Sequence, residues 1–327
     1  MLDDFLRELK VPVKYKFEIR KVSHMKVGGI AEQVVFPQDA KQLAEILSYL
    51  NDNNLDYLVV GNWSNTIFRS GKIKTILINL KNMNSVLVQG QKVFAEAGAL
   101  VPSISRLCAQ RGLRGFSGLY GVPATLGGAL FMNASCYGSE ISEYLSEVTV
   151  LDRNGKIEKL NKSELEFSWR SSSFQKFKDK VIISASFSLP ASTPEIELQQ
   201  IKNVELHRKK FQEHSLPNLG SVFATKDIYT DIASKNRNYG ALMYMVKVFV
   251  RFFPGPRDQL FARLMVSLTK KFFYQKSGYP NMFSDKSINC IVNRGSSSEQ
   301  LIAFIRDMKK KMHIKSDIEV IIFEDLK

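Results

Sequence analysis

Cysteine and histidine are scarce in this sequence, and long apolar runs are absent. The 327 residues include three cysteines and four histidines, too few and too scattered for a disulfide framework or a His/Cys zinc site. The cysteines stand among apolar neighbours, which is typical of a reducing compartment. No apolar run approaches about 20 residues, and no basic segment followed by an apolar one leads the chain. We therefore expect a cytoplasmic protein with no signal peptide, membrane span or metal site.

Acidic residues are outnumbered: 46 lysines and arginines stand against 32 aspartates and glutamates, a formal net charge of +14. Such an excess favours contact with polyanions, an anionic membrane surface or phosphorylated substrates, but it says little about the fold. A basic surface that is simply solvated explains it equally well. Nothing in the sequence resembles a module that stacks bases on aromatic residues, so we do not predict nucleic-acid binding.

The length suits two or three domains. The first part mixes helix and strand: a short helix and strand within 1–22, a strand end at 34–37, a helix starting at an Asp39 cap and ending near 53–54, and strands at 57–60 and 73–80. A second group follows, with strands at 85–88 and 93–97, a helix at 101–111, a hairpin of strands 148–152 and 157–160 that turns at 153–155, and a strand at 181–189.

The clearest linker is residues 190–194 (PASTP), and a basic, aromatic-rich stretch at 243–279 lies beyond it. The elements expected there are helices at 195–211, 260–273 and 298–312 and strands at 291–293 and 318–323. Helices alternating with strands predict a separate α+β domain. We predict domains at 1–84, 85–190 and 195–327.

Glycine is concentrated in two turns. Residues 121–138 (GVPATLGGALFMNASCYG) carry four glycines, and residues 61–65 (GNWSN) follow the apolar run 57–60. Backbone without a Cβ can adopt positive φ and approach a flat or phosphorylated ligand closely. A tight turn that opens a buried helix is the alternative reading of either segment alone. Two such turns together favour a large cofactor held at two places.

Three side chains outside these turns are candidates for chemistry. Arg170 stands among small hydroxyls and aromatics at 167–174, and its planar guanidinium suits a carboxylate or phosphate, although a surface ion pair would explain it too. Ser221 follows a glycine in an apolar turn, where it is a hydroxyl acid or only a turn serine. Glu319 falls on the expected strand 318–323, on the face it shares with Ile321. A carboxylate on that face costs free energy unless it is paired or used.

The sequence resembles the UDP-N-acetylenolpyruvoylglucosamine reductase family over nearly its whole length. Seven segments match that family's motifs in order: 26–31 (KVGGIA), 61–65, 121–138, 167–174 (FSWRSSSF), 212–223 (QEHSLPNLGSVF), 284–293 (SDKSINCIVN) and 317–320 (DIEV). Few residues separate Arg170 from the strand near residue 181, so the chain resembles the shorter subclass, which lacks a tyrosine-bearing loop.

The resemblance implies an α+β fold: a two-lobed FAD-binding domain of the PCMH type, followed by a substrate domain. It implies a bacterial cytoplasmic enzyme of peptidoglycan synthesis in which NADPH reduces FAD, and FAD reduces UDP-N-acetylglucosamine enolpyruvate at a carbon–carbon bond. Ser221 would be the general acid, with Arg170 and Glu319 stabilising the enolic intermediate. Arg170, Gln212 and Asn289 would bind the UDP-sugar. The implied FAD-binding residues are Gly61, Asn62, Ser64, Asn65, Gly121, Thr125, Gly127, Gly128 and Gly138.

The sequence departs from the family pattern at five positions: Trp63, Ala124, Ser135, Thr225 and Ser287. The chain between Ser221 and Asn289 is also about twice the expected length, and the excess is the basic stretch at 243–279. Two alternatives therefore stay open. One is a divergent flavoprotein that reduces a related nucleotide sugar for another surface glycan. The other is an inactive flavin-fold protein whose basic stretch docks on a membrane or partner.

Overall fold

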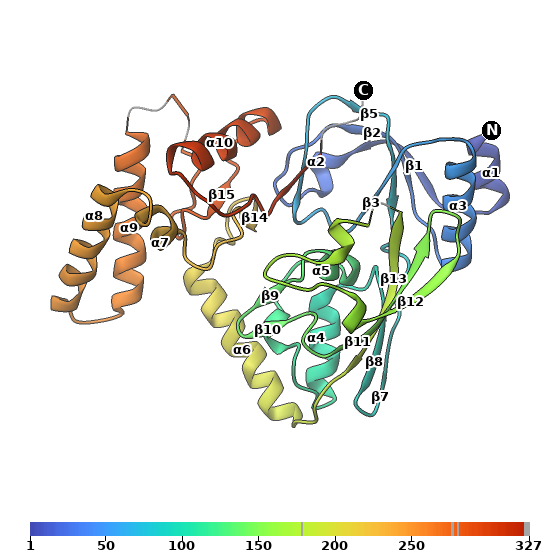
Figure 1. Cartoon of the computed structure of the whole chain (residues 1–327), viewed down its shortest axis with the longest axis horizontal. Coiled ribbons are helices and arrows are strands. Elements are labelled where there is room, and N and C mark those ends of the chain that lie inside the picture. Colours follow the sequence, from blue (N-terminus) through green and yellow to red (C-terminus); the bar gives the residue numbers. More distant parts are fainter. Residues whose placement is uncertain (178, 276–277, 280, 324–327) are drawn as a thin grey trace.

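The computed structural model describes residues 1–177, 179–275, 278–279 and 281–323. Figure 1 shows two sheet-containing units on one side and a largely helical unit, α7 to α10, on the other, with the long helix α6 running between them. Helices and strands are mixed but not in regular alternation, so the predicted α+β class is confirmed.

The first sheet has the order β1-β2-β6-β3, with β5 also pairing with β2. The pair β1–β2 is antiparallel and the other pairs are parallel. The predicted strand 73–80 is in fact two short strands that pair with different parts of β2. The Asp39 side chain accepts a hydrogen bond from Gln42 N–H, which confirms the predicted helix cap. The elements of this unit are α1 (Leu2–Glu8), β1 (Val13–Glu18), α2 (Ile19–Val22), β2 (Ile30–Val35), α3 (Ala40–Asp52), β3 (Tyr57–Val60), β4 (Thr66–Phe68), β5 (Lys72–Ile73) and β6 (Ile76–Asn79).

The second sheet is antiparallel with the order β12-β11-β13-β8-β7. The β11–β12 hairpin turns at 153–155, as predicted. The regular elements of this unit are β7 (Val86–Gln89), β8 (Lys92–Glu96), α4 (Val101–Gln110), α5 (Leu126–Phe131), β9 (Ser135–Cys136), β10 (Ser139–Glu140), β11 (Leu145–Asp152), β12 (Ile157–Asn161) and β13 (Lys180–Ser188), with short 3₁₀ turns at Ser117–Leu119, Lys162–Glu164 and Ser173–Gln175.

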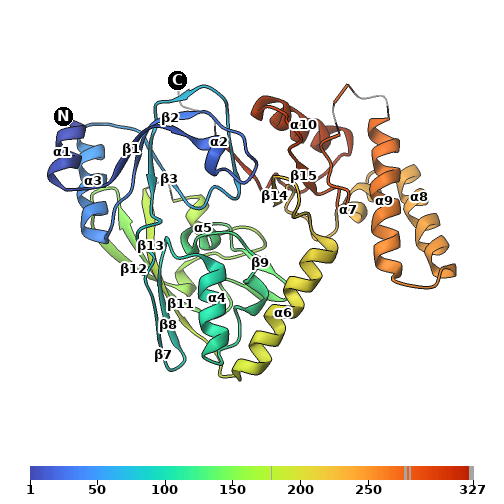
Figure 2. The ribbon, with the colours of Figure 1, turned by 180° about the vertical axis from the view of Figure 1, so that it is seen from behind.

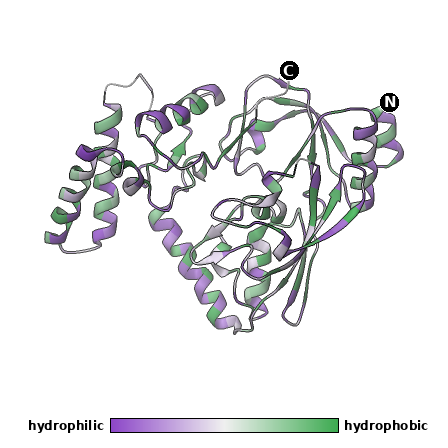
Figure 3. Ribbon diagram, in the orientation of Figure 1, coloured by the Kyte–Doolittle hydropathy of each residue, from purple (hydrophilic) through white to green (hydrophobic). Residues whose placement is uncertain are grey.

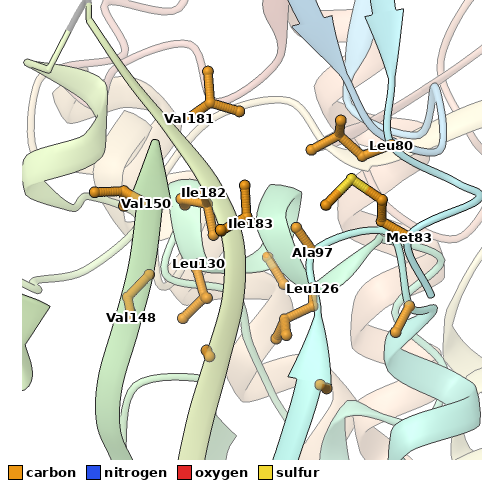
Figure 4. Close-up of a cluster of buried hydrophobic side chains, with 14 of the residues drawn as sticks. Leu80, Met83, Ala97, Leu126, Leu130, Val148, Val150, Val181, Ile182 and Ile183 are labelled. Carbon is orange, nitrogen blue, oxygen red and sulfur yellow. The ribbon is translucent and has the colours of Figure 1, made fainter. Parts of the chain in front are cut away.

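One apolar core joins the two sheets. Leu126 and Leu130 of α5 pack against the sheet at β13 and β8, and Leu80 and Met83 come from the segment that connects the two sheets (Figure 4). All four side chains are buried. Burying a side chain of this size stabilises the fold by roughly 1.5–3 kcal/mol, so this shared core fixes the position of α5 and of the glycine turn before it.

Helix α6 (Pro194–Phe211) packs against α4 and the 3₁₀ turn at Ser117–Leu119. Its Glu197 is buried and accepts a hydrogen bond from the Ser117 hydroxyl. The N-terminal half of α6 therefore lies on the second unit, although the sequence grouped it with 195–327. The domain limits 1–84, 85–190 and 195–327 remain a prediction.

The third unit is mainly helical, and α8 and α9 lie side by side as a projecting hairpin (Figures 1 and 2). Its core also takes in Met25 and Ile67 from the first unit. Its last strand, β16, returns to the first unit and pairs in parallel with β4. The elements are β14 (Asn218–Ser221), α7 (Ile228–Ala233), α8 (Arg237–Phe249), a 3₁₀ turn at Val250–Phe252, α9 (Arg257–Tyr274), β15 (Cys290–Val292), α10 (Ser298–Lys311) and β16 (Ile321–Phe323).

Candidate active site

Arg170 lies in a tight turn of the second unit. Ser168 and Ser171 exchange backbone hydrogen bonds across it, and Arg170 has a φ of 55°. A non-glycine residue in this left-handed region costs roughly 1–2 kcal/mol, a cost typical of functional sites. The neighbouring Trp169 Nε1–H donates to the Ala224 carbonyl at 3.2 Å. That bond joins the Arg170 turn to the segment that follows Ser221.

Glu319 lies where the chain leaves the third unit for the first. Its N–H donates to the Val222 carbonyl at 2.7 Å, and its own carbonyl accepts from Asn65 Nδ2 at 3.0 Å. The prediction that Glu319 belongs to a strand is wrong: Ile318 bridges to Phe223, and β16 begins only at Ile321. The strand is interrupted because the chain changes its hydrogen-bonding partner at Glu319.

The structure brings Arg170 and Glu319 together. Arg170 Nε lies 3.3 Å from Glu319 Oε1, and the two side chains are only 19% and 10% exposed. Burial raises the pKa of the Glu319 carboxyl above its usual value, and the positive charge of Arg170 opposes part of that rise. The carboxylate thus has a counter-charge in a place shielded from water, although Arg170 Nε forms no hydrogen bond among the described residues.

Ser221 is the last residue of β14 and is exposed. The next residue, Val222, receives two restraints: its N–H donates to the Asn289 side chain, and its carbonyl accepts from Glu319 N–H. Ser221 therefore stands one residue from the point where Glu319 joins the third unit. Its hydroxyl is open to a ligand that reaches the Arg170–Glu319 pair.

The first glycine turn offers unused backbone donors. Among the described residues, no hydrogen bond uses the N–H of Asn62, Trp63 or Ser64. The Gly61 carbonyl accepts from Asn79 Nδ2 at 2.9 Å, which fixes the start of the turn. Free N–H groups at the end of a strand suit a phosphate.

Trp63 occupies the family's second glycine position without filling the turn. Its φ of 54° is one that glycine adopts freely, so the backbone keeps the glycine-like shape. Its buried ring turns into the first unit, with ring-centre distances of 5.8 Å to Phe17 and 5.6 Å to Phe68. The side chain thus packs in the apolar cluster and leaves the phosphate side of the turn to backbone.

The two glycine segments touch each other. A Cβ on Gly61 would lie 2.6 Å from Thr125 Oγ1, and Asn62 Nδ2 donates to the Pro123 carbonyl at 2.9 Å. Thr125 in turn caps α5 by accepting from Gly128 N–H. The turns that the sequence placed on one large ligand therefore form one continuous surface.

The other glycines of 121–138 differ in their surroundings. The N–H of Gly127 donates to the Ala97 carbonyl at 2.9 Å. A Cβ on Gly127 would lie 3.2 Å from the Ala97 Cβ, so glycine here allows close packing beside the second sheet. The Arg208 side chain of α6 lies against Gly121, where a Cβ would collide with it. Gly138 has a φ of 78° and nothing within 4 Å of its Cβ position, so backbone there is open to a ligand.

The donors and acceptors around the turns fit a flavin. Asn133 Oδ1 and Ser135 Oγ are buried and have no hydrogen-bond partner in the part of the chain that the structure describes. Unpaired buried polar atoms are rare and call for a ligand or water. Within the described residues no group of three or more His, Cys, Asp and Glu side chains is placed to hold a metal ion.

Comparison with known proteins places this chain in a family. Residues 31–161 match the family model described as "FAD binding domain". UDP-N-acetylenolpyruvoylglucosamine reductases from Streptococcus pneumoniae strains Hungary19A-6 and JJA are each 35% identical over 213 residues, which is 65% of this chain and 70% of theirs. The chain belongs to the UDP-N-acetylenolpyruvoylglucosamine reductase family. The crystal structure of the Thermus caldophilus reductase (MurB) superposes with a TM-score of 0.69 over 96% of this chain and 99% of that one; at 20% identity this match supports the fold alone.

Two predicted substrate residues of this reductase-family chain have other structural partners. Asn289 Oδ1 accepts from the N–H groups of Val222 and Phe223, and its Nδ2 donates to the Phe223 carbonyl. Gln212 directly follows the last residue of α6, and its carbonyl accepts a hydrogen bond from Lys286 Nζ at 2.8 Å. Their contact with a substrate remains a prediction.

Two residues near the site were missed from the sequence. Asn133 stands in the 121–138 motif, and its unpaired Oδ1 makes it a candidate flavin contact; its place in the motif was the available signal. Arg208 reaches Gly121 and lies 4.0 Å from the Cys136 sulfur. No sequence signal marks it, because it stands among several basic residues at the end of α6.

Proposed function

We infer that this chain is an FAD-dependent reductase that uses NADPH to convert UDP-N-acetylglucosamine enolpyruvate to UDP-N-acetylmuramate in peptidoglycan synthesis. Membership of the reductase family supports this reaction. The observation that carries it here is the buried Arg170–Glu319 pair beside Ser221. These are three residues of the types the reaction needs, drawn from two units of the fold.

We assign the FAD pyrophosphate to the first glycine turn, where the N–H groups of Asn62, Trp63 and Ser64 have no protein acceptor among the described residues. Gly61, Asn65, Gly121, Thr125, Gly127, Gly128 and Gly138 would shape the surface around it. When bound, FAD supplies the hydride for the enolpyruvyl double bond, with NADPH as its reductant.

Arg170 binds the substrate carboxylate and the negative charge that develops on it, because a guanidinium in a shielded site interacts strongly with such charge. Glu319 keeps the guanidinium in place and limits the net charge of the site. Ser221 delivers the proton to the substrate carbon next to the carboxylate. A serine hydroxyl is a weak acid, so this transfer needs the strongly basic enolic carbon that forms in the same reaction.

Asn289 holds the Ser221 segment by three hydrogen bonds to Val222 and Phe223. We therefore assign it to positioning Ser221 as well as to the predicted contact with the UDP-sugar. Gln212 keeps its predicted place on the substrate side. A reaction that consumes NADPH and a nucleotide sugar fits the cytoplasmic compartment expected from the sequence.

The second candidate is reduction of a related nucleotide sugar. Ala124, Ser135 and Ser287 stand where the family pattern has glycine or histidine, so the surroundings of the site differ from the pattern. The basic stretch at 243–279 is a further difference. Contact of that stretch with a membrane is a separate proposal, because the reductase chemistry does not need it.

Stopped-flow absorbance of the purified flavoprotein tests the assignment. We expect NADPH to bleach the oxidised-flavin spectrum and UDP-N-acetylglucosamine enolpyruvate to restore it under anaerobic conditions. Bleaching by NADPH without recovery on adding that substrate would favour the related nucleotide sugar. Protein that remains colourless after incubation with FAD and removal of the unbound FAD would contradict both enzymatic candidates.

A further inference from the structure

The hairpin formed by α8 and α9 carries large apolar side chains where they are not covered. We call residues 244–257, from the last turns of α8 to the first residue of α9, the hairpin tip. Within it, Tyr244 is 68% exposed, Met245 59%, Phe249 51% and Phe252 81%, and Phe253 is exposed as well. Isolated exposed apolar residues are ordinary, but a cluster of five indicates a contact surface.

The root of the same hairpin is firmly packed. Tyr239 and Thr269 are fully buried, and their hydroxyl oxygens lie 2.6 Å apart. Tyr239 also contacts the Phe273 ring, and Lys270 pairs with Asp285 at 2.8 Å. Because the root is anchored in the core of the third unit, the exposed tip is a defined part of the fold rather than a loosely packed helix.

The exposed large apolar residues and the basic residues of α8 and its continuing turn form two separate rows. Met245, Phe249 and Phe252 are spaced by four and three residues, which places them along one side of the helix and its continuing turn. Lys247 and Arg251 are also spaced by four, but each stands two residues from Phe249, so they follow the side of the helix away from the apolar row. Figure 3 shows hydrophobic segments on both hairpin helices at the edge of the molecule. An apolar row on one side and a cationic row on the other is the pattern of a helix that lies at a membrane surface.

The hairpin is strongly basic. Residues 237–275 contain seven lysines and arginines and a single acidic residue, Asp258. In the described part of the chain, Arg251, Arg257 and Arg263 form no ion pair. A second copy of the chain would bring the same unpaired cations against each other. An anionic surface satisfies both the cations and the uncovered rings.

We propose that the hairpin tip is a peripheral docking site for anionic phospholipid membranes, with Phe249, Phe252 and Phe253 entering the headgroup region and Lys247, Arg251 and Arg257 contacting lipid phosphates. The rings suit the interface because aromatic side chains favour it. No helix among the described residues is long and apolar enough to cross a bilayer. Figure 1 shows the hairpin at the outer edge of the molecule, away from α5 and the glycine turn that precedes it, so docking leaves that turn uncovered.

Vesicle co-sedimentation of the full chain tests this directly. We expect binding to phosphatidylcholine vesicles that contain phosphatidylglycerol and much weaker binding to phosphatidylcholine alone. The F249S/F252S/F253S variant should lose most of this binding. The R251Q/R257Q variant should weaken it roughly 25-fold, since each cation near an anionic surface is worth about fivefold in affinity.

Matched controls carry the same chemical changes elsewhere. I196S/L206S removes two exposed apolar residues of α6, and K10Q/K41Q removes two exposed cations of the first unit. Both should bind vesicles like the unchanged chain. Turnover of every variant should stay within about twofold of the unchanged chain, so a failure of docking and a failure of the proposed reaction are separate results.

Three outcomes would overturn the proposal. The first is equal binding to neutral and anionic vesicles. The second is anionic binding that the controls weaken as much as the tip variants do, which would show a general effect of the net charge. The third is self-association by light scattering that F249S/F252S/F253S abolishes while vesicle binding is unchanged, which would identify a second copy as the occupant.

Discussion

Arg170 and Glu319 belong to different units of the fold, yet Arg170 Nε lies 3.3 Å from Glu319 Oε1 with little exposure of either side chain. Each reaches this place through a local irregularity. Arg170 has a positive φ in a tight turn, and Glu319 marks the point where the chain changes strand partners. Two local departures from regular structure thus produce one shielded ion pair.

Replacement of Glu319 by Gln should lower both stability and turnover. The change leaves the Arg170 guanidinium largely buried without its counter-charge, and loss of one partner of a buried pair costs about 3–5 kcal/mol. Because both side chains keep some exposure, we expect the unfolding free energy measured in urea to fall by about 1–3 kcal/mol. We also expect a clear loss of turnover. The control is Glu147→Gln, which removes an exposed pair with Lys159 and should cost under about 1 kcal/mol. Equal losses in the two variants would contradict the special role of the buried pair.

Ser221→Ala should separate flavin binding from proton transfer. Loss of a positioned proton donor typically lowers turnover by about 10²–10⁴-fold. Because Ser221 is exposed at the end of β14, its hydroxyl is not needed for packing, so FAD content and unfolding midpoint should not change. Stopped-flow traces should show normal flavin reduction by NADPH and slow reoxidation by substrate. Full turnover in the alanine variant would remove Ser221 from the proposed reaction.

Gly61→Ala should reduce FAD content. The added Cβ would lie 2.6 Å from Thr125 Oγ1, closer than real Cβ contacts, so either the Thr125 hydroxyl that caps α5 or one of the glycine turns must shift. We expect a lower flavin-to-protein absorbance ratio after purification. Gly240→Ala is a suitable control, because its Cβ meets only ordinary contacts and alanine favours a helix by up to about 1 kcal/mol. If Gly61→Ala keeps its full flavin content, the contact between the turns does not shape the site.

Trp63→Gly restores the residue of the family pattern, and we nevertheless expect it to destabilise the fold. Because glycine adopts a positive φ without strain, this part of the change should stabilise the fold by roughly 1–2 kcal/mol. Removal of a buried Trp from its contacts with Phe17 and Phe68 costs about 3–5 kcal/mol or more. Thermal unfolding should therefore show a net loss of about 1–4 kcal/mol in unfolding free energy. A more stable glycine variant would mean that the ring contributes little to the first unit.

Glu213 should make stability depend on acid pH. Burial alone would raise the pKa of this carboxyl, but hydrogen bonds from Ser215, Ser284 and the N–H of His214 outweigh it and lower the pKa to about 2 from the usual 4.5. A lowered pKa in the folded state stabilises the protein above about pH 4.5, and this stabilisation is lost as pH falls toward 2. The difference in unfolding free energy between the unchanged chain and Glu213→Gln should be about 2 kcal/mol at pH 7 after solvent screening, and should shrink toward zero near pH 2. A difference that is constant from pH 7 to 3 would contradict this account.

Local patterns predicted most of the elements correctly. The Asp39 cap, the apolar spacing of α3 and the turn at 153–155 depend on neighbours in sequence, and the structure confirms all three. The glycine turns were found in the same way, because the need for backbone without a Cβ is visible in the residue types themselves. The positive φ of Trp63 could not be predicted from its neighbours in sequence. Its ring packs in an apolar cluster with Phe17 and Phe68, which belong to other elements.

The contacts that make the site depend on distant segments. Nothing near Glu319 in sequence indicates that its N–H donates to the Val222 carbonyl while its own carbonyl accepts from Asn65 Nδ2. Because the chain changes partners here, the strand predicted at 318–323 begins only at Ile321. The same holds for Arg208 against Gly121 and for Thr125 against Gly61. Residue types and short-range spacing therefore specify the turns, caps and candidate chemical groups. Which groups meet is set by packing between units, because burial and hydrogen bonding select partners by position in space.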